Sequence, residues 1–289
     1  QPVYGIGLEA DLSEDLAPNL PGFRDSGPVR RGNQAAEHVQ HDVYGQVVLG
    51  VSQSFFDRRL LAQPGIAEFE QLEPVGERAF AVYDTPDAGI WEFRTIAHVH
   101  TSSAIMCWAA CDRLSRIAER LGLDNREAYW RERADIIHET ILEKAWNDEV
   151  KAFTAAFGGT DLDASVLLMA EIGFLPASDS RYISTVEAVD RDLRMGDHVY
   201  RYKVEDDFGK PKTAFTACTF WFIDALYRVG RVEEARNMFE AVLASRNHLG
   251  LLSEDVNPET NELWGNFPQT YCMVGIINSA ALLSKPWAA

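Results

Sequence analysis

Basic residues, long apolar runs and linker-like segments are all scarce in this sequence of 289 residues. Only 27 Lys and Arg stand against 44 Asp and Glu, and the resulting net charge of -17 repels phosphate backbones and anionic lipid headgroups. No apolar run approaches the roughly 18 residues that a membrane-spanning helix needs. The first residues, QPVYGIGLEA, also lack the basic and then apolar pattern of a signal peptide. Neither a nucleic acid nor a membrane is therefore expected as a partner.

Cysteine is scarce as well. Each of the four cysteines lies in an apolar stretch with helical spacing, and no tight second pair completes a zinc site: Cys107, Cys111, Cys218 and Cys272. A disulfide between Cys107 and Cys111 would be strained within one helix. The cysteines are predicted to be buried thiols, which favours a reducing, cytoplasmic location. No metal site and no cofactor are predicted.

Apolar residues recur at helical spacing along nearly the whole chain, whereas period-2 alternation is rare. The pattern predicts nine helices, at 31–53, 65–84, 101–122, 126–146, 161–173, 179–194, 213–230, 231–246 and 266–284. Short connections alternate with long ones, at 85–100, 147–160, 195–212 and 247–265. Helices joined by short turns pack antiparallel, so an up-and-down bundle would carry every long connection at one end, where functional loops are usual.

No Pro-rich or Ser-rich linker divides the chain, so residues 1–289 are predicted to form a single catalytic domain. The first thirty residues carry no helical pattern and resemble another long loop of the same series. A domain that begins with such a loop is predicted to be incomplete at its amino-terminal end. The alternation of short and long connections between helices is also typical of a helical repeat array, although no fixed period or repeated motif supports that alternative.

Two of the long loops carry a carboxylate near a tryptophan. The first contains DAGIWEFR at 87–94, where Glu92 lies between Trp91 and Phe93. Apolar neighbours disfavour the ionised form of a carboxyl group, which suits a general acid, although an exposed loop glutamate is the simpler alternative. The second contains LLSED at 251–255 and WGNFPQ at 264–269. Polar neighbours there would keep Glu254 ionised, as a general base requires. The alternatives are helix capping or calcium binding by Glu254 with Asp255, but a calcium site needs more oxygen ligands at close spacing than this loop offers.

The two loops together match the requirements of glycoside hydrolysis. In that reaction one carboxyl group protonates the leaving oxygen while the other activates water, and aromatic faces stack on the sugar rings. Resemblance adds to this interpretation. The segments GIWEFR at 89–94, MCWAACDR at 106–113, LDAS at 162–165, CTFWFIDAL at 218–226, and RNHLGLLSED with LWGNFPQ at 246–269 resemble glycoside hydrolase family 15.

That family comprises glucoamylases, glucodextranases and bacterial trehalases, and the resemblance covers essentially the whole chain. It implies an all-α fold, the (α/α)6 barrel of helical hairpins. Nine predicted helices fall three short of the twelve in such a barrel, so the first helices are predicted to be absent from this chain. The resemblance also implies catalysis that inverts the anomeric centre without a metal, and a possible partner in an amino-terminal segment or domain that this sequence does not contain.

By resemblance, Glu92 is the general acid and Glu254 is the general base. The segment RRGNQAAEHVQHDVYG at 30–45 is similar to the family's Arg-x-Gly-Asn helix. This implies a set of candidate substrate-binding residues: Arg30, Asn33, Asp42, Trp91, Arg94 and Trp264. The sequence departs from the family where Ser102-Ser103-Ala104 replaces His-Ser-Lys and where Lys212-Thr213-Ala214 replaces Gly-Glu-Gly, and both changes bear on substrate choice. The family's Trp-Pro-Arg-Asp segment would precede Gln1.

The sequence therefore predicts an inverting, exo-acting α-glucosidase of glucoamylase type. Its substrate would be the terminal α-linked glucose of a small gluco-oligosaccharide or of trehalose. An inverting phosphorylase on the same barrel, in which phosphate replaces the base, is disfavoured because Glu254 is retained. The non-enzymatic alternative is a truncated or degenerate barrel that serves as a carbohydrate-binding or scaffold module without catalytic activity.

Overall fold

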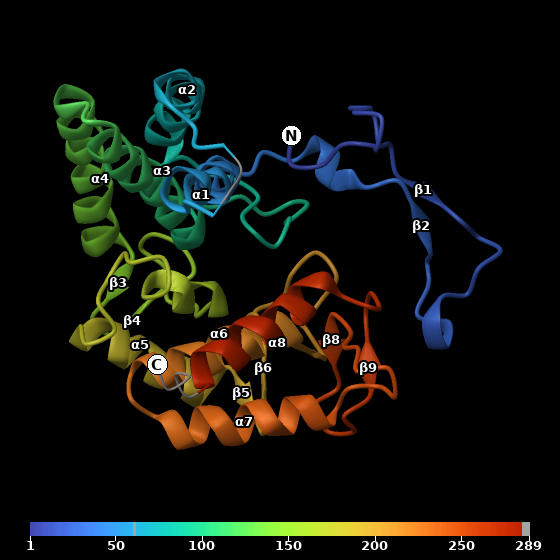
Figure 1. Ribbon diagram of the computed structural model, residues 1–289. Helices are drawn as coiled ribbons and strands as arrows, with labels where there is room; N and C mark the ends of the chain where they lie inside the picture. Colours follow the sequence, from blue (N-terminus) through green and yellow to red (C-terminus); the bar gives the residue numbers. More distant parts are fainter. Residues whose placement is uncertain (60–61, 285–289) are drawn as a thin grey trace. The chain divides into compact units, whose positions relative to one another are not determined.

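A computed structural model describes residues 1–59 and 62–284 of the chain (Figure 1). The chain forms two compact units, Gln1–Ile137 and His138–Ala289. The described residues hold eight α-helices, three short 3-10 helices and nine strands of two residues each. None of the helices in residues 1–59 and 62–284 combines the length and apolar character that a bilayer crossing requires.

Unit 1 is organised around one buried helix. Its helices are α1 (Asp42–Phe56), α2 (Ile66–Val82), α3 (Thr101–Leu121) and the first part of α4 (Asp124–Lys144). Figure 1 shows α1 and α2 alongside α3, and both pack against it. Most of α3 is buried, and Ala104, Leu114 and Ile117 have no exposed surface. Ahead of α1, the chain forms the ribbon of β1 (Asp15–Leu16) with β2 (Arg30–Arg31), and the 3-10 helices η1 (Phe23–Asp25) and η2 (Gln34–Glu37).

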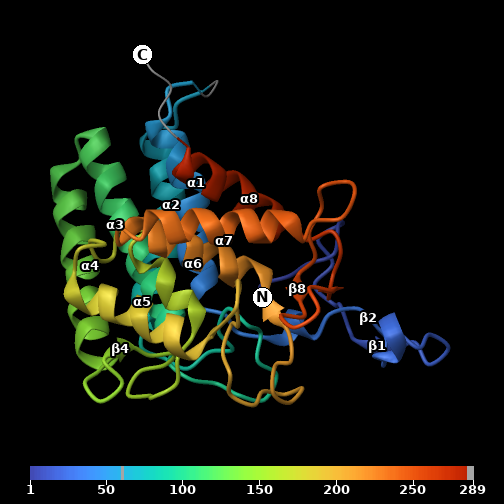
Figure 2. The same cartoon turned by 90° about the horizontal axis from the view of Figure 1, so that it is seen from below.

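Unit 2 is organised around α6 (Thr216–Arg228). This helix packs against η3 (Ala164–Met169), α7 (Val232–Ala244) and α8 (Thr270–Leu283), and α5 (Ser180–Asp192) lies against η3. Figure 2 shows the same elements after a quarter turn. Two hairpins and one small sheet connect the helices: β3 (Trp146–Asn147) with β4 (Ala152–Phe153), β5 (Arg194–Met195) with β6 (His198–Val199), and β7 (Ala214–Phe215), β8 (Asp255–Val256) and β9 (Leu263–Trp264) in the order β7-β8-β9.

Seven of the nine predicted helices are confirmed with end shifts of a few residues. The helix predicted at 31–53 begins only at Asp42, because Asn33 caps η2 by accepting a hydrogen bond from the Ala35 amide and His38 is extended. The helix predicted at 161–173 is wrong, since only the six-residue η3 forms there. Its start is fixed by a distant contact, in which the Ala164 amide donates to the Arg201 carbonyl at 2.9 Å.

The long connections of unit 2 lie together, as the alternation of connection lengths predicts. Strand β7 ends the connection at 193–215, strand β8 belongs to the connection at 245–269, and the two strands pair antiparallel. The bond from Ala164 to Arg201 brings the end of a third connection, 145–163, to the same group. Unit 2 thus gathers its irregular segments around the beginnings of η3 and α6.

Close packing of α1 on α3 depends on Gly45. A Cβ atom at this position would collide with the backbone carbonyl of Met106 in α3, whereas a Cβ atom on Gly50, further along α1, would meet nothing within 4 Å. We expect Gly45→Ala to lower the free energy of unfolding by about 1–3 kcal/mol, because neither backbone can yield cheaply. Chemical denaturation followed by circular dichroism measures this change.

Gly50→Ala is the matched control for that experiment. It adds the same methyl group to the same helix in open space, and it should leave stability unchanged or raise it by up to about 1 kcal/mol through helix propensity. Equal losses from the two substitutions would contradict the close approach of α1 and α3.

Candidate active site

Glu92 lies at the tip of a closed turn in the connection between α2 and α3. The Phe93 amide donates to the Ala88 carbonyl and the Glu92 amide donates to the Gly89 carbonyl, each at 3.1 Å. The φ angle of Glu92 is 58°, in the left-handed region that costs a residue with a side chain roughly 1–2 kcal/mol. Its side chain is exposed. Strain of this kind persists only where surrounding contacts fix the backbone, and it is common at functional sites.

The buried carboxylate of Asp87 holds the base of this turn. Its Oδ2 accepts hydrogen bonds from the His41 amide and from the Ser103 hydroxyl, both at 2.8 Å. Its backbone pairs with that of His98 through reciprocal hydrogen bonds of 2.9 and 3.3 Å. The turn is thereby tied to the beginnings of α1 and α3. Sequence reasoning missed Asp87, although an aspartate that opens the segment DAGIWEFR was a usable signal.

Two buried histidines accompany Asp87. Burial lowers the pKa of His41 and of His100, while the nearby Asp87 carboxylate opposes the shift in both cases. His41 Nε2 lies 2.9 Å from the Thr85 hydroxyl, and the His100 ring stacks on Phe93 with ring centroids 5.6 Å apart. Both rings therefore favour the neutral form. They pack against the loop that carries Glu92.

Asp42, a predicted substrate-binding residue, is the first residue of α1 and is only 3% exposed. Its Oδ2 accepts a hydrogen bond from Gln46 Nε2 at 3.0 Å, whereas Oδ1 has no partner in the part of the chain that the structure describes. Burial raises the pKa of Asp42 to about 6, and the nearby carboxylates of Asp87 and Glu92 add to the effect. A buried carboxyl group with an unused oxygen is costly, and such groups concentrate at ligand sites.

Glu254 lies directly before β8 in unit 2, and its partners are polar, as the sequence predicts. Its backbone carbonyl accepts from the Thr216 amide, and its amide donates to the Asn266 carbonyl, each at 2.9 Å. The Oε2 atom accepts two further hydrogen bonds, from Asn266 N at 3.0 Å and Asn266 Nδ2 at 2.9 Å. Gly265, with φ of 74°, makes this cradle possible, because a Cβ atom there would lie 2.9 Å from Oε2.

The residue after Glu254, Asp255, sets a half-buried carboxyl group beside it. Burial raises the pKa of Asp255 to about 6, the charge of Arg201 opposes this, and the Thr213 hydroxyl donates to Asp255 Oδ2 at 3.1 Å. Asp255 also pairs in register with Trp264 of β9, whose indole Nε1 donates to Glu262 at 3.1 Å. The sheet thus brings Glu254 and the predicted aromatic residue Trp264 to one place.

The remaining predicted residues lie in unit 1 with Glu92. Arg30 and Arg94 both bind Glu14, which sequence reasoning missed: Arg94 through Nη1 at 3.0 Å and Nη2 at 2.8 Å, and Arg30 through Nε at 2.8 Å. Asn33 caps η2, and its side-chain oxygen accepts a hydrogen bond from the Ala35 amide. Trp91 is half-buried within the turn of Glu92. The substrate-binding roles of these residues remain predictions.

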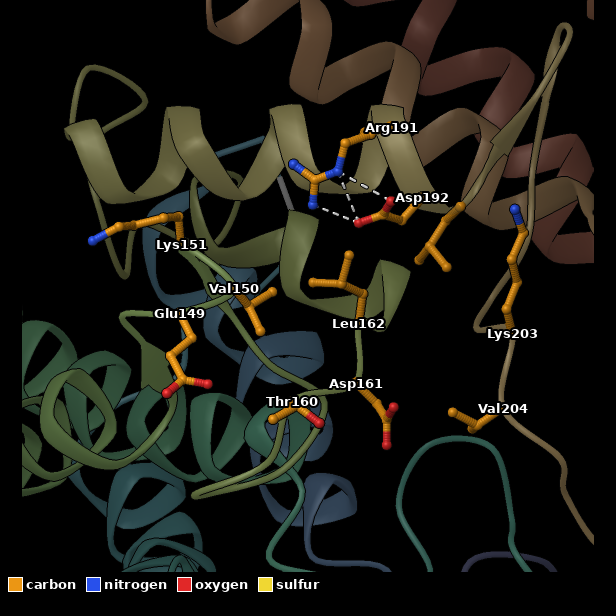
Figure 3. A pocket seen from close by; sticks show the side chains of 11 residues that line it. Glu149, Val150, Lys151, Thr160, Asp161, Leu162, Arg191, Asp192, Lys203 and Val204 are labelled. Carbon is orange, nitrogen blue, oxygen red and sulfur yellow. Dashed lines mark hydrogen bonds and ion pairs between the residues drawn. The ribbon is translucent and has the colours of Figure 1, made fainter.

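A hollow of about 710 Å³ in unit 2 does not contain the predicted base (Figure 3). Its charged lining residues balance in sign: Lys151, Arg191 and Lys203 against Glu149, Asp161 and Asp192. Arg191 donates to the neighbouring Asp192, with Nη2 2.5 Å from Oδ2. No aromatic side chain is among the residues that line it, so it offers no stacking surface for a sugar ring.

The cysteines are buried and free, which confirms the predicted thiols. Burial raises the pKa of Cys111 and of Cys272 to about 12, so neither is a reactive thiolate. Within residues 1–59 and 62–284, no group of three or more His, Cys, Asp or Glu side chains could hold a metal ion.

The family profile described as "Glycosyl hydrolases family 15" matches residues 3–281. The chain belongs to this family. It is 36% identical to a trehalase of Mycolicibacterium smegmatis over 96% of this chain and 42% of that protein. It is 31% identical to a trehalase of Thermoplasma volcanium over 98% of this chain and 45% of that protein. The family 15 chain therefore spans less than half the length of these two relatives.

Solved structures show the same fold. A glycosidase matches 84% of the family 15 chain and 67% of its own chain with a TM-score of 0.71 at 19% identity. A bacterial glucoamylase complexed with acarbose matches 85% of this chain and 41% of its own with a TM-score of 0.66 at 14% identity. These likenesses confirm the all-α class and the helical hairpins of the (α/α)6 type.

Burial of Asp42 makes stability depend on pH in a definite direction. Its pKa of about 6 in the folded state exceeds the ordinary value of about 3.9, so the folded state binds the proton more tightly and stability falls as pH rises from about 4 to 6. We expect Asp42→Asn to raise the free energy of unfolding by about 1–3 kcal/mol at pH 8 and by much less near pH 4.5. Chemical denaturation at the two pH values measures the difference.

Asp84→Asn is the control, because Asp84 is exposed at the end of α2. This substitution should change stability little at either pH. A gain from Asp42→Asn of the same size at both pH values would contradict a raised pKa as its cause.

Proposed function

We propose that the protein hydrolyses α-linked glucosides by general acid and base catalysis with inversion, and that its substrate is α,α-trehalose. The observation that carries this proposal is the match to curated trehalases, which extends along 96% and 98% of this chain at 36% and 31% identity. The chemistry of two carboxylates on loops supports it. We also infer that residues 1–289 serve as part of a longer catalytic domain.

Glu92 is assigned the role of general acid. Its proton goes to the glycosidic oxygen as the bond from that oxygen to the anomeric carbon breaks. The hydrogen-bonded turn and the left-handed φ angle define the position of the Glu92 backbone. Because the acid is already oriented, little conformational entropy is lost in positioning it when the substrate binds.

Glu254 is assigned the role of general base. Water attacks the anomeric carbon, and its proton passes to the Glu254 carboxylate as the new carbon–oxygen bond forms. The two donors of Asn266 hold Oε2, so we assign the other oxygen, Oε1, to the attacking water. An inverting reaction needs room for that water, and we therefore expect the carboxyl groups of Glu92 and Glu254 to lie roughly 6.5–9.5 Å apart in the working enzyme.

A second candidate substrate is the non-reducing end of a small gluco-oligosaccharide. The fold likeness to a glucoamylase complexed with acarbose favours it, but at 14% identity that likeness carries less weight than the trehalase relatives do.

We infer a cytoplasmic location from the four free, buried cysteines.

Both catalytic assignments can be tested by neutral replacement. In the full natural protein, Glu92→Gln and Glu254→Gln should each lower kcat on trehalose roughly 10²–10⁴-fold, because each removes one proton transfer. Both side chains lie on loops, so circular dichroism should report folding like that of the wild type.

Glu259→Gln is the matched control, since Glu259 is an exposed residue of the same connection as Glu254. It should retain the wild-type rate. Near wild-type turnover by either Glu92→Gln or Glu254→Gln would refute that residue's assignment.

The stereochemistry of the products is a separate prediction. Inversion at one anomeric carbon of α,α-trehalose releases one β-glucose and one α-glucose per molecule, because the leaving glucose keeps its configuration. Proton NMR during the first minutes, before mutarotation, should show equal amounts of the two anomers. Initial release of α-glucose alone would indicate a covalent intermediate and a nucleophile in place of a base.

A further inference from the structure

We propose that Glu14 is a positioning residue for this reaction, because its carboxylate holds Arg94 and, through Arg94, the strained turn that carries Glu92. Glu14 belongs to the segment directly before β1, some 80 residues away from Arg94 in the sequence. The inference rests on the proposed function, in which Glu92 donates the proton.

The contact between Glu14 and Arg94 has the geometry of a strong ion pair. Arg94 Nη1 lies 3.0 Å from Glu14 Oε1, and Nη2 lies 2.8 Å from Oε2, so the two planar groups meet through parallel hydrogen bonds. Only 17% of the Glu14 side chain and 23% of the Arg94 side chain are exposed. Paired bonds of this kind fix orientation as well as distance. The bond from Arg94 also holds the pKa of Glu14 below its usual range.

Two further side chains complete the anchor. Arg30 of β2 donates from Nε to Glu14 Oε1 at 2.8 Å, and Gln34 of η2 accepts a hydrogen bond from Arg94. The pairing of β1 with β2 puts Glu14 and Arg30 on the same face of the ribbon, because Arg30 is in register with Leu16, two residues after Glu14. The ribbon and η2 therefore present one site to which Arg94 binds.

This anchor acts on Glu92 because the two residues are close along the chain. Arg94 follows Glu92 by two residues, and such a step spans at most about 7 Å. Asp87 fixes the turn on its amino-terminal side, through His41 and Ser103. The pair of Arg94 and Glu14 fixes it on the other side. With both ends held, the left-handed Glu92 backbone has little freedom to relax.

Glu14 also balances charge around the acid. It lies between the cations Arg94 and Arg30. The other titratable groups around the turn are Asp42 at the start of α1, His41 directly before it, Asp87, and His98 and His100 ahead of α3. An uncompensated guanidinium near Glu92 would favour its ionised form, which cannot donate a proton. Replacing Glu14 would therefore change the charge around the turn as well as its anchoring.

The test compares Glu14→Gln with Asp15→Asn in the full natural protein, with trehalose as the probe. Asp15 is the neighbouring residue, and its carboxylate lies 3.7 Å from Arg31 with both side chains 72% exposed. We expect Glu14→Gln to lower kcat roughly 10–100-fold with a smaller effect on KM, because the acid is misplaced. Asp15→Asn should retain wild-type kinetics.

The pH profile separates positioning from a merely structural role. A positive charge near Glu92 that Glu14 no longer balances should move the alkaline limb of kcat/KM about 0.3–1 pH unit toward lower pH. The double variant Glu14→Gln with Arg94→Gln removes that charge, and its alkaline limb should return at least halfway to the wild-type position although kcat stays low. Glu14→Asp keeps the charge but shortens the reach, so it should lower kcat without moving the limb.

The outcomes can be told apart. Wild-type rates in Glu14→Gln, or an alkaline limb that stays in place or moves to higher pH, would overturn the role of Glu14 alone. If Glu14→Gln does not fold, Glu14→Asp decides, and a wild-type kcat in that variant would overturn the inference. A wild-type protein that releases no glucose from trehalose, maltose or isomaltose would refute the proposed function, and this inference with it.

Discussion

The buried carboxylate of Asp87 is the contact on which the loop that carries Glu92 depends. It accepts hydrogen bonds from the His41 amide at the beginning of α1 and from the Ser103 hydroxyl in the first turn of α3. Through these two hydrogen bonds, the loop that carries Glu92 is held by two helices that pack in the hydrophobic core. Loss of this carboxylate would leave two buried donors without their acceptor, which costs more than the hydrogen bonds themselves contribute.

Unit 2 uses a comparable device around Glu254. The first residue of α6, Thr216, donates its amide to the Glu254 carbonyl, and the amide and side chain of Asn266 both donate to the Glu254 carboxylate. Amides in the first turn of a helix have no partner within the helix and are available for loops. In each unit the predicted catalytic glutamate is thereby tied to the beginning of a buried helix, which gives a loop residue the precision of the helical scaffold.

This arrangement carries a cost in stability. Burial raises the pKa of both Asp42 and Asp255 to about 6, and it lowers the pKa of His41 and His100. Glu92 adds a strained backbone. Proteins retain such unfavourable features mainly where function requires them, and the rest of the fold offsets their cost through packing. The buried length of α3 and the packing of α6 against η3, α7 and α8 supply that compensation.

The sequence by itself determined seven helices and the two glutamate segments, because apolar periodicity and short motifs are local properties. Tertiary structure decided what depends on distant partners. The segment at 161–173 forms only the 3-10 helix η3, whose beginning is set by the Asp163 cap and by the bond between Ala164 and Arg201, neither of which has a periodic signal. Glu14 meets Arg94 only because a ribbon returns across 80 residues of chain, and no pattern in the intervening sequence specifies that meeting.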